Sequence, residues 1–209
     1  MTSIDTITIE VADVAAARHF YTAAFGLGDD LLRLRASDAP TTGFRGFTLS
    51  LIVSQPANVD ALVDAALDAG ATTLKAPKKS MWGYGGVVQA PDGTIWKAAT
   101  PKKKDTGPAT KEFEDVVLLL GVADVSASKK FYVGQGLTVG KSFASTYVEF
   151  ARGSGAVQLG LYKRRGLAKD AGVSPDGTGS HRIAVGGTSG PFTDPDGFAW
   201  ETSSLAARS

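Results

Sequence analysis

The chain has few side chains that could do chemistry, because it contains two histidines, His19 and His181, and no cysteine. The absence of cysteine excludes disulfides, thiolate nucleophiles and cysteine-bound zinc. Near the end of the sequence, the stretch TDPDGFAWE ends on Glu201. A histidine beside a carboxylate can transfer protons or hold a divalent metal ion. Any metal in this chain would therefore have to be held by His, Asp, Glu or Gln side chains.

A second copy of this turn and strand, APDGTIWKA, carries Lys97 at the position of Glu201. An ammonium group repels a divalent cation, so Lys97 speaks against a metal at its own position and can instead bind an anion. Strand alternation places Lys97 and Glu201 on the inner face of a sheet, and Trp96 and Trp200 beneath the helices. The alternative for Lys97 is a surface lysine whose ammonium group stays in solvent.

Both stretches belong to an internal repeat. A VAD step and an FY pair occur early in the chain and again at an offset of 111 residues, as in Val122 against Val11. The turn-and-strand stretches follow at an offset of 104, as in Trp200 against Trp96. We therefore expect one module over residues 1–100 and a second over residues 113–209. The polar, basic segment 101–112 contains two prolines and is expected to be a linker.

Hydrophobic periodicity predicts that each module starts with a strand and an amphipathic helix. The first strand, Ile4 to Val11, alternates apolar and polar residues and places Glu10 on its polar face. A second helix, capped by Asn58, is expected in the first module, and the second module is expected to lack its second helix. This order favours an α+β fold, with mainly antiparallel sheets and helices on their outer face.

The ordered VAD, FY and DPDG-x-x-W-E motifs resemble those of the vicinal oxygen chelate superfamily, which includes glyoxalase I, bleomycin-resistance proteins and extradiol dioxygenases. The resemblance covers most of both modules. It implies two tandem glyoxalase-like modules of βαβββ units, whose sheets curl into cups. It also implies a divalent metal held by side chains from the first, middle and last strands. One such fold hosts unrelated activities, so the resemblance does not by itself fix the function.

The resemblance assigns the metal-ligand positions residue by residue. The first-strand position holds Thr6 in one module and Val117 in the other, where the family usually has histidine. The last-strand position holds Lys97 and Glu201. The first cup is therefore not expected to hold a metal.

The second cup keeps two of the residue types that the resemblance requires. His181 matches the middle-strand histidine and Glu201 the last-strand glutamate, and either Gln158 or Glu149 would supply a third ligand. The alternative is a hydrogen-bonded pair in which His181 orients Glu201.

Three functions fit these residues. The first is a small-molecule binding protein of the glyoxalase and bleomycin-resistance type with a degenerate metal site, in which Glu10, Trp82, Lys97 and Tyr147 contact the ligand. The second is a divalent-metal-dependent lyase or dioxygenase that uses His181 and Glu201. The third is a scaffold whose cups are filled by its own side chains. Apart from a divalent metal in the second case, no cofactor is expected.

The composition sets the remaining expectations. A formal net charge of +1 over 209 residues gives no general attraction to nucleic acid or to an anionic membrane. No apolar run is long enough to span a bilayer, and the N-terminus lacks the pattern of a signal peptide. We expect a cytoplasmic protein, either a monomer or a homodimer, whose partner is a small molecule.

Overall fold

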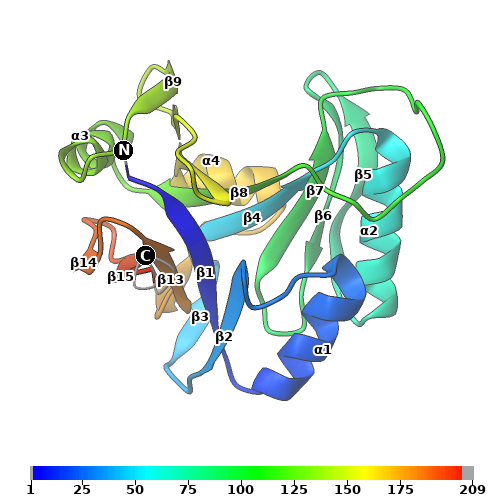
Figure 1. Ribbon diagram of the computed structural model, residues 1–209, viewed down its shortest axis with the longest axis horizontal. Helices are drawn as coiled ribbons and strands as arrows, with labels where there is room; N and C mark the ends of the chain where they lie inside the picture. Colours follow the sequence, from blue (N-terminus) through cyan, green and yellow to red (C-terminus); the bar gives the residue numbers. More distant parts are fainter. Residues whose placement is uncertain (1, 204–209) are drawn as a thin grey trace.

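The computed structural model describes residues 2–203, which form four helices and fifteen strands (Figure 1). The helices are α1 (Val14–Phe25), α2 (Pro56–Asp68), α3 (Val125–Gly134) and α4 (Arg164–Ala171). The strands are β1 (Ile4–Val11), β2 (Leu32–Ala36), β3 (Thr41–Gly43), β4 (Phe47–Ile52), β5 (Thr72–Ser80), β6 (Gly83–Gln89), β7 (Ile95–Thr100), β8 (Asp115–Val122), β9 (Val139–Phe143), β10 (Tyr147–Phe150), β11 (Val157–Lys163), β12 (Gly177–Gly179), β13 (Ile183–Gly187), β14 (Phe192–Thr193) and β15 (Ala199–Thr202). Eight of the twelve strand pairings are antiparallel, which confirms the expected α+β class.

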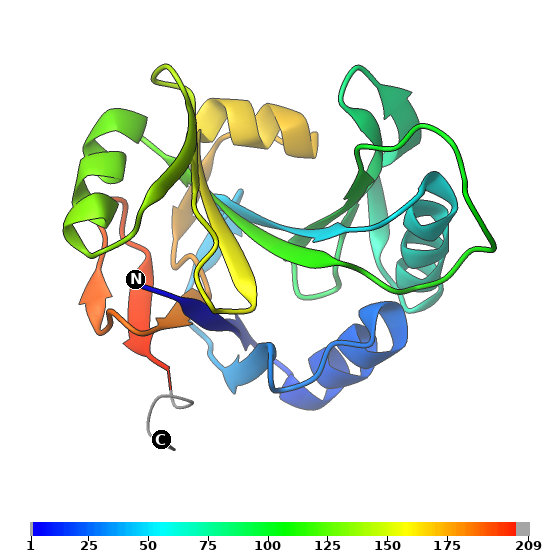
Figure 2. The ribbon, with the colours of Figure 1, turned by 45° about the horizontal axis from the view of Figure 1, so that its top comes forward.

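The larger sheet joins the two halves of the chain. Its order is β5-β6-β7-β4-β8-β11-β10-β9, so it contains two complete βαβββ units, β4-α2-β5-β6-β7 and β8-α3-β9-β10-β11. The units meet where β4 pairs antiparallel with β8, with Ser50 opposite Val117. The first unit comes from the first half of the sequence and the second unit from the second half (Figure 2).

The smaller sheet is made from what remains of each half. Its order is β14-β15-β13-β1-β2, and β1 pairs antiparallel with β13. The first half contributes few strands here, because few residues separate α1 from β4. A two-stranded ribbon, β3 with β12, also links the halves. Both main sheets therefore contain strands from both halves of the chain.

The second half contains a helix that the sequence analysis did not predict, α4, which lies between β11 and β12 and not between β13 and β14, where the second helix was expected to be missing. Helix α4 follows β11 directly, has no side-chain cap and starts with two arginines, so the usual start signals are absent. Its buried residues Leu167, Ala168 and Ala171 pack with Ile95 and Val87. These two residues alternate with the residues that face α1 and α2, so α4 lies on the inner face of the eight-stranded sheet, between its two units (Figure 2).

Each of the two main sheets packs a buried tryptophan against a helix. Trp96 and Trp200 are each 2% exposed, as strand alternation predicted. Trp96 packs against Tyr21 and Phe25 of α1. Trp200 packs against Tyr132 of α3. None of the helices in residues 2–203 is long and apolar enough to cross a membrane.

The tyrosine of each FY pair ties its helix to the PDG turn. The hydroxyl of Tyr21 donates to Asp92 (2.6 Å), and that of Tyr132 donates to Asp194 (2.6 Å) and accepts from the Trp200 indole N–H (3.2 Å). Burial first, and then the carboxylate charge, raise the pKa of both tyrosines well above the usual range. Both therefore remain hydrogen-bond donors at neutral pH.

The segment expected as a linker, 101–112, has no helix or strand and is held by the start of α2. The Gln55 amide oxygen accepts from the backbone N–H groups of Thr106 and Gly107, at 2.7 and 2.9 Å. The Asp105 carboxylate caps α2 by accepting from the N–H of Ala57 (2.7 Å). The prediction that Asn58 caps this helix is wrong, because the helix begins at Pro56 and the cap comes from the linker.

We expect the substitution Tyr132→Phe to lower the free energy of unfolding by about 1.5–3 kcal/mol, because it removes a donor from the 5% exposed Asp194. Burial already raises the pKa of Asp194, and loss of the donor should raise it further. The deficit should therefore shrink as the pH falls from about 7 to about 4 and the carboxylate becomes protonated. Urea unfolding of the unmodified protein and of the variant at both pH values measures this difference in the free energy of unfolding.

Tyr84→Phe is the matched control for this prediction. Tyr84 donates to Asp60 (2.8 Å) at a partly exposed site, so its loss should cost about 1 kcal/mol or less. Equal losses in the two variants would contradict the role of burial at Asp194.

We expect Gln55→Ala to release the linker, because the substitution removes all the side-chain contacts that Gln55 makes with residues 106–108. Limited trypsin digestion should cut at the lysines of 102–104 several-fold faster than in the unmodified protein. Asp64→Ala, a change at an exposed position of α2 that makes no hydrogen bond with the linker, should leave the rate unchanged. An unchanged rate for Gln55→Ala would show that the linker is held by other contacts.

Candidate functional site

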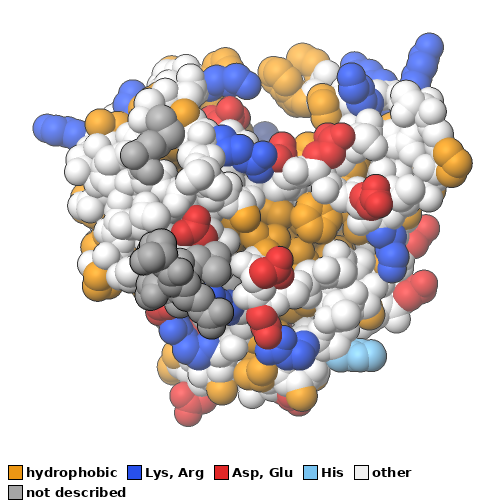
Figure 3. Space-filling model, in the orientation of Figure 1, with side chains coloured by type: hydrophobic (Ala, Val, Ile, Leu, Met, Phe, Trp, Pro, Cys, Tyr) orange, Lys and Arg blue, Asp and Glu red, His pale blue; other side chains and the backbone are white. Residues whose placement is uncertain are grey.

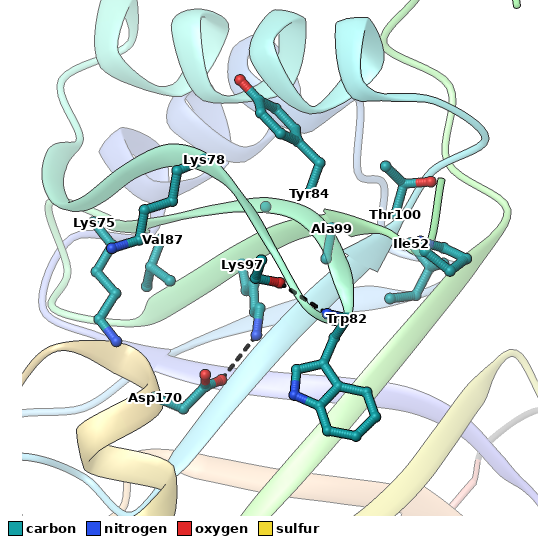
Figure 4. Close-up of a pocket in the computed structure, with 13 residues that line it drawn as sticks. Ile52, Lys75, Lys78, Trp82, Tyr84, Val87, Lys97, Ala99, Thr100 and Asp170 are labelled. Carbon is teal, nitrogen blue, oxygen red and sulfur yellow. Dashed lines mark hydrogen bonds and ion pairs between the residues drawn. The ribbon is translucent and has the colours of Figure 1, made fainter. Parts of the chain in front are cut away.

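A cavity of about 330 Å³ opens on the inner face of the eight-stranded sheet (Figure 4). It lies over the unit made by β4 to β7, beside the C-terminal end of α4. The lining residues are Ile52, Lys75, Lys78, Ser80, Trp82, Tyr84, Gly85, Val87, Lys97, Ala99, Thr100, Pro101 and Asp170. The strands supply all of them except Trp82, Pro101 and Asp170, so its floor is part of the sheet.

Lys97 lies on the cavity floor, as predicted from strand alternation. In the sheet it is opposite Val87 on one side and Ser50 on the other. Its ammonium group forms an ion pair with Asp170 of α4 (2.8 Å), and the two side chains are 32% and 48% exposed. Lys97 is thus neither fully in solvent nor buried, and its partner comes from the other half of the chain.

Two further lysines make the cavity cationic. Lys75 donates to the backbone carbonyl of Lys169 (2.7 Å), at the end of α4. The ammonium group of Lys78 has no hydrogen-bond or ion-pair partner among residues 2–203. Three ammonium groups therefore line a cavity that contains one carboxylate, Asp170.

Trp82 forms the outer wall of the cavity. It lies at the turn between β5 and β6 and is 84% exposed. Pro101 also lines the cavity. Neighbouring Met81 is 80% exposed. Apolar side chains and Lys or Arg side chains meet at this end of the molecule, beside a hollow in its surface (Figure 3). A large aromatic ring beside a cationic cavity provides a surface on which a flat molecule can stack.

Tyr147, the other aromatic candidate, lies elsewhere on the same face. Its hydroxyl donates to Glu149 (3.2 Å), and its ring packs against Phe143 and Tyr162. Burial raises the pKa of Tyr147. Tyr162 also packs against the α4 cluster. Helix α4 and these rings therefore occupy the part of the inner face that the second unit contributes.

Glu201 and Glu10 are brought together on the five-stranded sheet by an arginine that the sequence analysis did not single out. Arg35 donates to Glu201 (2.7 Å) and to Glu10 (2.8 Å). The hydrogen bond to Glu201 is the main cause of the raised pKa of Arg35. Neither carboxylate contacts the cavity.

His181 has separate contacts from Glu201. One ring nitrogen, Nδ1, faces the backbone carbonyl of Arg45, and Nε2 faces that of Asp196 (3.0 Å). The ring stacks on the buried Phe198, with centroids 4.0 Å apart. Both nitrogens are thus occupied by backbone, and no hydrogen bond or ion pair joins His181 to Glu201 among the described residues.

The strand pairings change how the ligand positions are grouped. Val117 lies in one row with Lys97 and Gln158 on the eight-stranded sheet, joined through Ser50. Thr6 lies in one row with Glu201 on the five-stranded sheet, joined through Gly186. Each row takes its first-strand and last-strand positions from opposite halves of the chain. The sequence analysis had grouped these positions within each half.

A divalent metal does not fit either row. In the first, an ammonium group occupies the last-strand position and the apolar Val117 occupies the first-strand position. In the second, the guanidinium of Arg35 pairs with both carboxylates, so their oxygens already accept from a cation. No group of three or more His, Cys, Asp or Glu side chains with metal-binding geometry occurs within residues 2–203. Lys97 and Arg35 therefore place positive charges where a divalent metal would need the lone pairs of its ligands.

Two solved structures of other proteins have a fold similar to that of this chain. Glyoxalase I from Zea mays is similar with a TM-score of 0.61 and 16% identity, over 96% of this chain and 91% of that one. A putative dioxygenase from Bacillus subtilis is similar with a TM-score of 0.53 and 14% identity, over 88% of this chain and 69% of that one. No family model and no curated protein matches the sequence.

At identities of 14 and 16%, these likenesses establish the fold and leave the activity open. They agree with the paired βαβββ units and with the motifs of the internal repeat. The chain therefore has a fold similar to that of glyoxalase I, built from paired βαβββ units, as the motifs in the sequence suggested.

Proposed function

We propose that the protein binds a small molecule in the cavity formed by β4 to β7, Trp82 and α4. The observation that carries this proposal is the cavity itself, which is concave, mostly apolar and lined by a few charged groups. Its volume of about 330 Å³ is at the lower end of the ~300–1,000 Å³ typical of small-molecule sites. Two residues selected from the sequence, Trp82 and Lys97, both line it.

The metal-dependent alternative has less support. It requires His181 and Glu201 to share a metal, whereas the ring nitrogens of His181 face backbone carbonyls and Glu201 is paired with Arg35. The self-filled scaffold describes only the second unit, where α4 and Tyr162 pack on the inner face. The first unit retains open space. Binding without a metal is therefore the function that the arrangement of residues favours.

The proposal predicts that Ala99→Phe blocks binding. Ala99 is a partly exposed residue on the cavity floor, so a phenyl ring there would fill the space without entering the core beneath α2. A screen of neutral, anionic and cationic aromatic compounds by thermal shift should find compounds that raise the Tm. Their apparent Kd should rise at least tenfold in Ala99→Phe.

Tryptophan fluorescence locates the binding site in this screen. Trp82 is 84% exposed, whereas Trp96 and Trp200 are each 2% exposed, so acrylamide quenching reports mainly on Trp82. A bound compound should protect Trp82 from quenching in the unmodified protein. The control Ala127→Phe introduces the same ring at an exposed position of α3 and should bind like the unmodified protein. Compounds that bind Ala99→Phe equally well, or a screen without hits, would refute the proposal.

A further inference from the structure

We propose that the ligand of this cavity is a small carboxylate with an aromatic body, and that Asp170 occupies the carboxylate position on Lys97 while no ligand is bound. This inference rests on the proposed function and adds the chemical class of the ligand. It also assigns Asp170 a role as an internal competitor.

The first argument is the balance of charge. Lys75, Lys78 and Lys97 line the cavity against the single carboxylate of Asp170, which leaves an excess of two positive charges. Like charges confined to a partly shielded space repel one another, so the cavity favours an added anion and disfavours an added cation. Lys78 has no partner for its ammonium group among residues 2–203, so it can bind a ligand without breaking another contact.

The second argument is the position of Asp170. It is the residue before the last in α4, where the helix dipole disfavours a carboxylate. Its interaction with Lys97 at 2.8 Å compensates for this position. In Figure 4 the Asp170 carboxylate lies at the end of the Lys97 side chain. A carboxylate attached to a ligand would find the same donor from inside the cavity.

The third argument is that this ion pair is easily exchanged. With side chains 32% and 48% exposed, the pair is of the surface kind, which contributes little to stability. A ligand carboxylate can replace Asp170 on Lys97 at little cost, because Asp170 then returns to water. The aromatic body gains contacts that the Asp170 side chain cannot make.

The fourth argument is the apolar part of the lining. Ile52, Val87 and Ala99 form the floor, and Trp82 forms a wall. A flat aromatic ring fits between such a floor and an indole, with its charged group directed toward α4 and the lysines. The lining thus places the apolar and anionic parts of the ligand at opposite sides of the cavity.

The test compares 1-naphthoate with its neutral analogue 1-naphthamide, by titration with Trp82 quenching and calorimetry as readouts. We expect 1-naphthoate to bind at least tenfold more tightly, because only the carboxylate forms charge-assisted hydrogen bonds with the lysines. Its Kd should rise with ionic strength, whereas that of 1-naphthamide should not.

Three variants assign the contacts. Lys97→Gln should weaken 1-naphthoate binding about tenfold, and Asp170→Asn should strengthen it about three- to tenfold by removing the competitor. The matched control is Lys141→Gln, which removes a lysine that pairs with Glu149 on β9 and β10, outside the cavity. It should leave the Kd unchanged. Circular dichroism confirms that each variant is folded.

The outcomes separate this inference from the proposed function. Equal affinities for 1-naphthoate and 1-naphthamide, both lost in Ala99→Phe, would overturn the carboxylate specificity and leave small-molecule binding intact. Tighter 1-naphthoate binding that Asp170→Asn does not improve would overturn the role of Asp170. If neither probe binds in a manner sensitive to Ala99→Phe, the ligand class assigned here is wrong, and the broader screen decides whether the proposed function also fails.

Discussion

The antiparallel pairing of β4 with β8 is the constraint on which the site depends. Ser50 opposite Val117 fixes the register of the eight-stranded sheet, and β7, which carries Lys97, is aligned on β4. A shift of β7 by one residue against β4 would exchange the two faces of β7, placing Trp96 in the cavity and Lys97 under the helices. The same pairing brings β11, and with it α4, over the inner face. The first half of the chain supplies most of the cavity lining, and Asp170 from the second half completes it.

This assembly explains why the repeated strand has opposite charges at its inward position. Lys97, from the first half, pairs with Asp170 of the second half, and Glu201, from the second half, pairs with Arg35 of the first half. Each charge is matched by a side chain from the other repeat. Once the partners differ, the two copies no longer need the same residue. One member of each pair, Lys97 or Glu201, occupies the last-strand position that the family resemblance assigns to a metal ligand.

The sequence predicted what depends on local pattern. The first strand and the first helix, the hairpin around the first PDG, the fold class and the burial of Trp96 and Trp200 follow from periodicity and turn residues. It did not predict which strands pair, because two repeats with similar strands can assemble within or across halves. Helix α4 was missed because its cap signals are absent. Without α4, Asp170 could not be inferred as the partner of Lys97.

Burial separates the contacts that hold this fold from those that can change with a ligand. The Tyr132–Asp194 hydrogen bond lies at a carboxylate 5% exposed, where breaking it leaves a buried charge short of a donor. The Lys97–Asp170 pair is almost as short, with 2.8 Å between its charged atoms against 2.6 Å for the tyrosine hydrogen bond. Both of its side chains are nevertheless exposed to water. Separating that pair returns each charge to solvent, which makes it replaceable. Similar distances therefore carry different free energies, and solvent exposure decides which interaction is structural and which is available for binding.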